Sequence, residues 1–544
     1  MVTASLIRSK QIQRFQEIEY DILIIGGGIT GAGIALDASV KGLKVALVEM
    51  NDFASGTSSK STKLIHGGLR YLKNLEFGLV RETGTERAIA FKNAPHLVKA
   101  EPMMLPVLKN GSMSKLAVSF GVWFYDFLAG VPAKERRIML SKVQAENTEP
   151  LLKKEILKGA AVYHEYRTDD ARLTIEILKT ARANGAEILN YCKAFEPIYQ
   201  NEKVRGFKVF DSIDSNAFEI KAKVVINAAG PWVDEVRKSA NAISNKKLVL
   251  SKGVHLVVDR AKLPVKQACY VDVLQNKGRM IFIIPRDKTT YIGTTDTFFE
   301  NADAPNVTQD DVNYLLDAVN AVFEGVHLKM EDIQSSWSGV RPLLYEEGKP
   351  STELSRKDEL FVAENDLITI AGGKLTGYRK MAERSVQKAI EIAGLNSNNK
   401  DTEHVVLSGG DIPCAINKFI GMKKDECSQI PHEAEYIERL VNRYGRETEE
   451  IISIAYQLYN EDRTLENPLE LAELKYVVEK EWVMKPADFY VRRASMLYFY
   501  RPEIHSHREK NNLFFLKILG YSESQYKLYQ QEFDIEYNSA LKFD

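Results

Sequence analysis

The stretch Tyr20–Met50, YDILIIGGGITGAGIALDASVKGLKVALVEM, decides the fold. An apolar run ends in three glycines, a helix-like segment follows, and a second apolar run ends in Glu49. Gly26, Gly28 and Gly31 fit the spacing G-x-G-x-x-G between a strand and a helix. The first glycine permits the tight turn, the second lets a pyrophosphate approach the backbone, and the third lets helix and strand pack closely. The stretch therefore predicts a parallel α/β unit that binds a dinucleotide.

Glu49 supports this interpretation, because it ends the second strand 18 residues after Gly31. A carboxylate at that position can accept a hydrogen bond from a ribose hydroxyl of the adenosine. The amides at the N-terminus of the following helix would face the phosphates. A glycine turn without a ligand is the alternative, and the strand–turn–helix–strand context favours the dinucleotide.

Two later segments indicate FAD rather than NAD. Val224–Trp232, VVINAAGPW, is an apolar strand that runs into a glycine turn. Ile368–Ile390, ITIAGGKLTGYRKMAERSVQKAI, is a strand, a Gly-Gly turn and the start of a helix. The amides and dipole of that helix start would face the flavin pyrimidine ring, where negative charge collects on reduction. Either segment alone is compatible with a structural turn, but three such turns in this order favour FAD.

Composition and pattern indicate a globular protein of more than one domain. The chain has 544 residues, 44% of them hydrophobic and 27% charged, with a formal net charge of −1, so no overall field favours nucleic acid. Strand and helix patterns alternate up to Gly394, with an antiparallel portion in the middle. The strand-like runs are Asp21–Ile25, Lys44–Val48, Lys223–Asn227, His255–Val258, Arg279–Ile284 and Leu367–Ala371, and Ala171–Asn184 has a helical pattern. The polar stretch Gly394–Asp401 predicts a linker between an α/β region, 18–394, and a helical domain, 402–544.

Asp52–Leu72, DFASGTSSKSTKLIHGGLRYL, joins a Ser/Thr-rich segment to HGGLRYL. With the glycine turn it closely resembles the FAD-dependent glycerol-3-phosphate dehydrogenase family. The resemblance extends to KGVHLVV (Lys252–Val258), GVRPL (Gly339–Leu343), GGKLTGYR (Gly372–Arg379) and ADFYVRRASMLYF (Ala487–Phe499). It implies a Rossmann-like FAD-binding domain interleaved with an antiparallel-sheet substrate domain, plus a C-terminal all-helical domain.

The resemblance implies oxidation of sn-glycerol 3-phosphate to dihydroxyacetone phosphate, with hydride transfer from C2 to FAD and electrons passed to a membrane quinone. One alternative is a glycerol-3-phosphate oxidase that uses oxygen, although such relatives tend to carry an extra internal segment. A second is a flavin-binding protein without turnover. A third is an amino-acid or amine oxidase, whose site would hold a carboxylate and an amine, whereas several cations suit a phosphate better.

The same resemblance implies roles for individual residues. Arg70, Tyr71, Arg356 and Lys374 would converge on the phosphate, since arginine matches phosphate oxygens and lysine adds a point charge. Arg341 would hold the C2 oxygen, and His255 would accept the proton of the hydroxyl. Without the resemblance, Arg356 is better explained as a solvated arginine and His255 as a satisfied strand histidine, and Arg341 also fits a structural ion pair. The expected FAD contacts are Gly26, Gly28, Gly31, Glu49, Ser58, Ser59, Thr62, Lys63, His66, Gly230, Gly373, Leu375 and Thr376.

The quinone implies a membrane surface, yet no run reaches the roughly 18 apolar residues of a spanning helix. The nearest, Ala117–Val131, is interrupted by Asp126. We therefore expect a peripheral protein on the cytoplasmic face of the cell membrane. Leu6–Ile18 and the aromatic run Phe120–Phe127 are the candidate contacts, although the second is better explained as a core segment and the first as a plain surface helix.

Other partners are not indicated. The four cysteines include no Cys-x-x-Cys pair, which suits a reducing compartment. His505 and His507 form a His-x-His pair without a further ligand cluster nearby, so no metal is expected. A homodimer is left open by the sequence.

Overall fold

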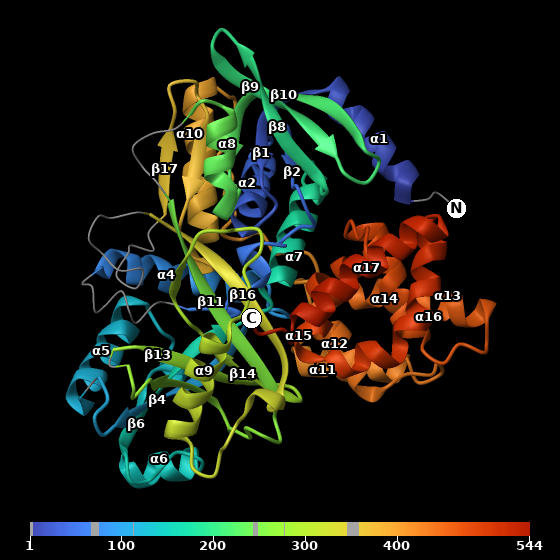
Figure 1. Cartoon of the computed structure of the whole chain (residues 1–544). Helices are drawn as coiled ribbons and strands as arrows, with labels where there is room; N and C mark the ends of the chain where they lie inside the picture. The colour runs from blue at the N-terminus through green and yellow to red at the C-terminus, as the bar shows by residue number, and fades with distance from the viewer. Residues whose placement is uncertain (1–3, 67–75, 113, 243–247, 277, 345–357) are drawn as a thin grey trace.

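The computed structural model describes residues 4–66, 76–112, 114–242, 248–276, 278–344 and 358–544 (Figure 1). It contains two sheets, helices that cover their faces, and a C-terminal group of helices beside the second sheet.

The first sheet, sheet A, holds the opening glycine turn. Its main path runs β17 (Glu359–Val362), β18 (Ile368–Ala371), β10 (Asn216–Asn227), β1 (Glu19–Ile25), β2 (Val45–Val48) and β7 (Glu187–Leu189), while β8 (Cys192–Gln200) and β9 (Lys203–Asp211) extend β10. The four neighbouring pairs from β18 to β7 are parallel. In β1, Ile22 and Ile24 join the core under one layer of helices, and Leu23 and Ile25 join the core on the opposite face. Burial on both faces explains why β1 is an unbroken apolar run.

One layer on sheet A consists of α2 (Ile29–Val40), α7 (Asp170–Ala183) and α10 (Tyr378–Ala393), and α2 packs between the other two. On the opposite face lie α1 (Ala4–Glu17) and α8 (Val233–Ser239). The parallel strands with helices on both faces confirm the predicted Rossmann-like half of the molecule.

The second sheet, sheet B, is largely antiparallel. Its strands are β15 (Thr297–Phe299), β11 (Leu248–Asp259), β14 (Thr289–Gly293), β13 (Met280–Arg286), β12 (Ala268–Asp272), β4 (Lys99–Leu108), β6 (Leu157–Arg167) and β3 (Leu64–Ile65), with β16 (Ile333–Leu344) on β11 and β5 (Ile138–Leu140) on β6. Its helices are α4 (Phe77–Asn93), α5 (Lys115–Leu128), α6 (Lys142–Thr148) and α9 (Gln309–Val322). Because the chain passes between the sheets several times, the two domains are interleaved, as predicted.

The C-terminal region is helical in its described part from α11 onward. It comprises α11 (Ile416–Glu426), α12 (Ala434–Tyr444), α13 (Thr448–Glu461), α14 (Pro468–Lys480), a π-helix (Asp488–Arg493), α15 (Met496–Phe499), α16 (Arg501–Leu519) and α17 (Glu523–Ser539). Tyr498 and Phe499 share one apolar core with Tyr291 and Trp337 of sheet B. The helical region is therefore packed directly against the second sheet.

Three carboxylates, Glu176, Glu447 and Glu481, converge where α7 meets the C-terminal helices. Arg172 makes ion pairs with Glu176 and Glu481, and Lys179 pairs with all three. Arg172 and Lys179 balance two of the three negative charges, and their ion pairs tie α7 to the C-terminal helices.

The N-terminal helix does not present the apolar face that the sequence suggested for a membrane. In α1, Ile12 and Phe15 are 8% and 0% exposed and belong to the core under sheet A. Arg8 is also buried, and its Nη2 lies 2.7 Å from Oδ1 of Asp211. The expectation of a free surface helix over Leu6–Ile18 is therefore wrong for these residues. None of the helices in the described ranges is long and apolar enough to cross a bilayer.

Candidate active site

A cavity of about 1930 Å³ lies where sheets A and B meet. Its walls come from the ends of β1, β2 and β18, from β13 and β16, and from the loop Ser55–Thr62. Small-molecule pockets usually measure about 300–1,000 Å³, so this cavity has room for a dinucleotide together with a small substrate.

The first glycine turn brings the start of α2 against the end of β1. Gly26 has a φ of +114°, and a Cβ there would lie 2.5 Å from the carbonyl oxygen of Ala228. A Cβ on Gly31 would lie 1.9 Å from the carbonyl oxygen of Gly26, so Gly31 serves packing and does not line the cavity. Gly28 is the N-cap of α2 and does line it. This geometry fits a pyrophosphate at the helix N-terminus.

Glu49 lies on the cavity wall at the end of β2. Its Oε2 accepts a hydrogen bond from the amide of Gly27 at 2.7 Å, and its Oε1 accepts one from the amide of Asn51 at 2.9 Å. Burial raises the pKa of the carboxyl, and these amides oppose the shift. A carboxylate has about four acceptor sites, so two remain for ribose hydroxyls. Glu49 thus fits the adenosine end of the cofactor.

The other two turns lie on the same cavity. Gly230 and Gly373 have φ values of +56° and +82° and line the wall. Leu375 and Thr376 open the turn before α10, and the Thr376 hydroxyl donates to the carbonyl of His66 at 3.2 Å. All of these residues line the cavity. The three turns together fit an extended FAD molecule, whose flavin end would lie toward α10.

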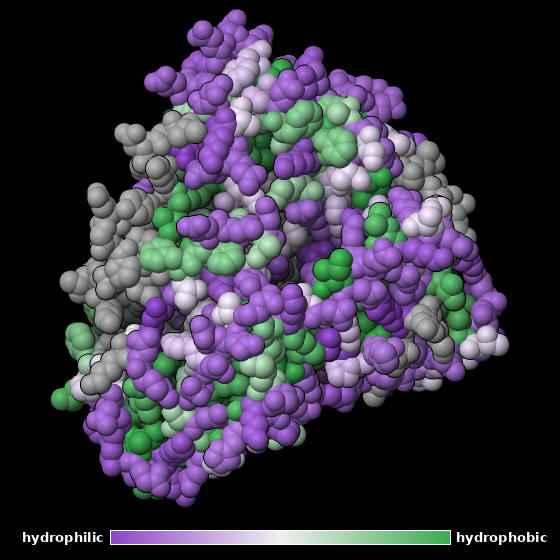
Figure 2. Space-filling model, in the orientation of Figure 1, coloured by the Kyte–Doolittle hydropathy of each residue, from purple (hydrophilic) through white to green (hydrophobic). Residues whose placement is uncertain are grey.

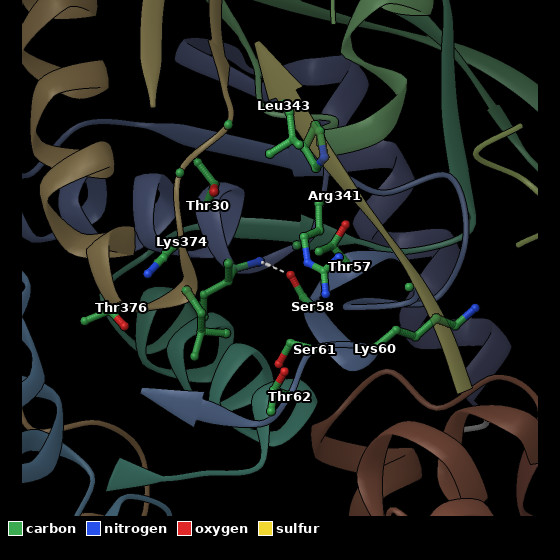
Figure 3. Close-up of a pocket in the computed structure, with 18 of the residues that line it drawn as sticks. Thr30, Thr57, Ser58, Lys60, Ser61, Thr62, Arg341, Leu343, Lys374 and Thr376 are labelled. Carbon is green, nitrogen blue, oxygen red and sulfur yellow. Dashed lines mark hydrogen bonds between the residues drawn. The ribbon is translucent and has the colours of Figure 1, made fainter. Parts of the chain in front are cut away.

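Two of the predicted substrate cations face the cavity (Figure 3). Arg341 projects from β16, and its Nη2 donates to Oγ1 of Thr294 at 3.0 Å. Gly253 on neighbouring β11 makes room for this guanidinium, because a Cβ there would lie 2.2 Å from the Arg341 Nη2. Lys374 lines the cavity from the turn after β18. The remaining three predicted phosphate contacts, Arg70, Tyr71 and Arg356, lie outside the described residues.

His255 is 1% exposed and lies behind the wall. Its ring stacks on Trp337 with centroids 4.8 Å apart and an interplanar angle of 10°. It occupies the space over Gly293, where a Cβ would lie 2.1 Å from Cδ2 of the imidazole. Its Nε2 is 3.0 Å from Oγ1 of Thr62, which does line the cavity. Burial, and then the charges of Arg341 and Lys63, hold the pKa of His255 well below its usual value, so the imidazole is neutral.

Two predicted FAD contacts are turned away from the cavity. The Ser59 hydroxyl donates to the carbonyl of Gly56 at 3.4 Å. Lys63 is 1% exposed, and its Nζ lies 2.5 Å from Oδ1 of Asp170 and 2.9 Å from the carbonyl of Ser59. The cavity wall in the described structure includes neither residue, in contrast to Ser58, whose Oγ accepts from the amide of Ile29 at 2.9 Å. Ser59 and Lys63 hold the shape of the loop instead.

The cavity also includes residues that the sequence analysis did not select. Thr294 and Asp296 follow β14, and Asp296 bonds to the hydroxyl of Ser251. The sequence could have indicated these two residues, because TTDT (Thr294–Thr297) is a polar run directly after an apolar strand. Thr57 also lines the wall, and its hydroxyl donates to the carbonyl of Val340 at 2.6 Å, which ties the loop to β16.

Helix α5 forms one side of the cavity and is exposed on its other face. Phe120 and Phe124 line the cavity, yet Phe120, Trp123 and Phe127 are 64%, 49% and 71% exposed. Figure 2 shows hydrophobic surface at the left edge of the molecule, where Figure 1 places α5. The expectation that Phe120–Phe127 is a core segment is therefore wrong for this face. The buried side chains of the helix are Val118, Val122, Tyr125 and Asp126.

Family comparisons agree with this geometry. Residues 21–379 match a family model described as "FAD dependent oxidoreductase", and residues 400–525 match one described as "C-terminal domain of alpha-glycerophosphate oxidase". A curated aerobic glycerol-3-phosphate dehydrogenase from Staphylococcus haemolyticus is 49% identical, covering 100% of this chain and 98% of its own. The chain belongs to the FAD-dependent glycerol-3-phosphate dehydrogenase family. Another member, from Staphylococcus epidermidis, is 48% identical over 99% of this chain and 98% of its own.

Solved structures extend this family relationship. A glycerol-3-phosphate dehydrogenase from Bacillus halodurans, complexed with FAD, matches with a TM-score of 0.85 and 40% identity, covering 100% of this chain and 99% of that one. An L-α-glycerophosphate oxidase from Mycoplasma pneumoniae has a TM-score of 0.56 at 20% identity, over 70% of this chain and 97% of its own. The second match reflects the shared fold alone, whereas the first joins this chain to the dehydrogenases.

Proposed function

We propose that the chain oxidises sn-glycerol 3-phosphate to dihydroxyacetone phosphate with bound FAD, and that a membrane quinone takes up the electrons. The observation that carries the proposal is the placement of Arg341 and Lys374 on the wall of a cavity built from three dinucleotide turns. An arginine and a lysine there suit an anionic alcohol substrate better than an amino acid, whose amine would be repelled.

FAD, when bound, supplies the acceptor for the hydride that leaves C2 of the substrate. The protein's own part is to hold the substrate and to manage charge. Lys374 contributes a point charge for the phosphate dianion, and Arg70, Tyr71 and Arg356 remain predicted partners of the same group. Arg341 would face the C2 oxygen and stabilise negative charge that develops there. The neutral imidazole of His255 is available as a proton acceptor.

The exposed face of α5 supports docking on a membrane. Three aromatic side chains of this helix, Phe120, Trp123 and Phe127, are exposed, and exposed basic residues stand at its first position, Lys115, and shortly after its end, Lys134 and Arg136. An apolar face flanked by cations is the pattern of an interfacial helix on anionic lipid. Because Phe120 and Phe124 also line the cavity, a lipid-soluble quinone would enter beside this helix. We propose on this basis that the protein docks on the cytoplasmic face of the cell membrane.

Anaerobic mixing of the FAD-loaded protein with glycerol 3-phosphate tests the activity, and we expect the substrate to reduce the flavin and bleach its absorbance. The reduced protein is then re-oxidised either by a quinone analogue or by oxygen. Faster re-oxidation by the quinone supports the proposal. Rapid, stoichiometric hydrogen peroxide in air would make the protein an oxidase, and no bleaching at all would leave a flavin-binding protein without this activity.

A further inference from the structure

Thr62 stands between His255 and the cavity. The hydroxyl oxygen of Thr62 lies 3.0 Å from Nε2 of His255, and Thr62 lines the cavity. The imidazole itself is 1% exposed and is absent from the wall formed by the described residues. Figure 3 shows Thr62 and Ser61 on the same side of the cavity that Arg341 reaches from β16. A substrate in this cavity therefore meets the hydroxyl of Thr62 before it meets the imidazole.

Both sides of this contact are held in place. The Tyr291 hydroxyl donates to the carbonyl of Thr62 at 3.1 Å, and the Trp337 indole donates to the carbonyl of Ser61 at 3.1 Å. Trp337 also stacks on His255, so one side chain fixes the loop and the imidazole together. Behind Trp337 lies Tyr498 of the C-terminal region, with ring centroids 5.0 Å apart. The oxygen–nitrogen contact is thus a fixed feature of the fold.

The groups around His255 leave it neutral and able to accept a proton. Arg341 and Lys63 are the two cations that face it, and Lys63 is paired with Asp170. Nδ1 of His255 has no hydrogen-bond partner among the described residues, which leaves the Thr62 hydroxyl as the polar contact of the ring. A substrate phosphate dianion brings negative charge to the same cavity, and negative charge nearby favours a protonated imidazole during the reaction.

We propose that the hydroxyl of Thr62 relays the proton of the substrate's C2 hydroxyl to His255. The proton on the C2 oxygen moves to Oγ1 of Thr62 as the proton of Thr62 moves to Nε2 of His255. FAD, when bound, would accept the C2 hydrogen with its electron pair, and the C2–O bond would become the carbonyl. Thr62 is unchanged at the end, and His255 holds one additional proton. This inference rests on the proposed function and assigns Thr62 a chemical role in place of a cofactor contact.

The test compares a hydroxyl with an isosteric methyl. Thr62→Val removes the hydroxyl at nearly constant volume, Thr62→Ser keeps it, and Thr62→Ala is a second hydroxyl-free variant without added bulk. With flavin content and melting temperature matched, anaerobic flavin reduction by glycerol 3-phosphate is followed by stopped flow. We expect Thr62→Val and Thr62→Ala to reduce their flavin about 10²-fold or more slowly, as for loss of general base catalysis, and Thr62→Ser to stay near wild type.

Two further measurements separate a relay from a structural role. The double variant Thr62→Val with His255→Gln is expected to be no slower than the slower single variant, because both remove one shared path. Acidification is expected to slow wild type and Thr62→Ser as His255 becomes protonated, and to leave Thr62→Val unaffected over that range.

Wild-type rates in Thr62→Val and Thr62→Ala, or fully additive losses in the double variant, would overturn the relay while the proposed function stands. A wild-type protein that glycerol 3-phosphate does not reduce would overturn the proposed function and the relay with it.

Discussion

Asp52 links the loop Ser55–Thr62 to the C-terminal helical region, and its replacement by Asn is the most informative stability test. Asp52 is 1% exposed, and its carboxylate accepts from Nη1 and Nη2 of Arg493 at 2.7 and 2.9 Å. It also accepts from Nε of Arg492 at 2.5 Å and from the Asn190 amide at 3.1 Å. The segment that begins at Asp52 continues into Ser55–Thr62, which lines the cavity at every position except Ser59.

The expected loss follows from these contacts. Asn keeps one acceptor oxygen but presents an amide to a guanidinium, so two buried arginines lose their shared anion. Removing one partner of a buried ion pair costs about 3–5 kcal/mol. Burial alone would raise the pKa of Asp52, but Arg493 and Arg492 hold it below its usual value of 3.8. Since the folded pKa is the lower one, this stabilisation is complete above about pH 4 and is lost as the pH falls below it.

Urea unfolding of the Asp52→Asn variant at pH 7 measures the effect. Trp482 is a suitable probe because it lies 5.3 Å from Phe53, centroid to centroid, and its carbonyl accepts from Asn190. We expect the unfolding midpoint and the flavin release to shift to lower urea. Glu196→Gln, which breaks the exposed pair with Lys208, is the control and is expected to change neither.

An Asp52→Asn variant that unfolds at the wild-type midpoint, and releases its flavin there, would refute this account. So would equal losses in Asp52→Asn and in the surface control. A second check is acid sensitivity, because the difference between wild type and Asp52→Asn must shrink as the pH falls below about 4.

Three further outcomes are expected. Gly28→Val should purify largely flavin-free, because the valine side chain would occupy the turn; even a Cβ added at Gly28 would lie 3.1 Å from Oγ of Ser58. The flavin absorbance near 450 nm measures this, and a normal flavin content would contradict the predicted cofactor site. Lys374→Ala should raise KM about 10–100-fold with little change in the reduction rate constant, because the phosphate charge is the same in ground and transition states; an unchanged KM would remove Lys374 from the substrate site. Phe120→Ser with Phe127→Ser should weaken liposome binding by about 2–4 kcal/mol, since each ring is about two-thirds exposed. Phe298→Ser, at an aromatic side chain 54% exposed on β15, is the matched control, and equal losses in both variants would contradict docking through α5.

The sequence by itself determined the parallel sheet, the glycine turns and the acidic end of β2, because these are local properties. A turn that needs φ of +114° at Gly26, or a strand buried on both faces, leaves its mark within a few residues. The cofactor followed from the same stretches. The family motifs GVRPL and GGKL pointed to Arg341 and Lys374, and both residues line the cavity.

Only the tertiary structure decided which side chains of the Ser/Thr-rich loop face the cavity. Lys63 turns to Asp170, 107 residues away, and Thr62 meets His255, 193 residues away. The tertiary structure also buried Arg8, Ile12 and Phe15 of α1, where the sequence favoured a surface helix, and exposed one face of α5, where it favoured a core segment. The physical reason is that apolar burial is not directional, so a sequence pattern tells which face is apolar but not what covers it. Partners such as Asp52 and Arg493, 441 residues apart, are brought together only by the packing of the whole chain.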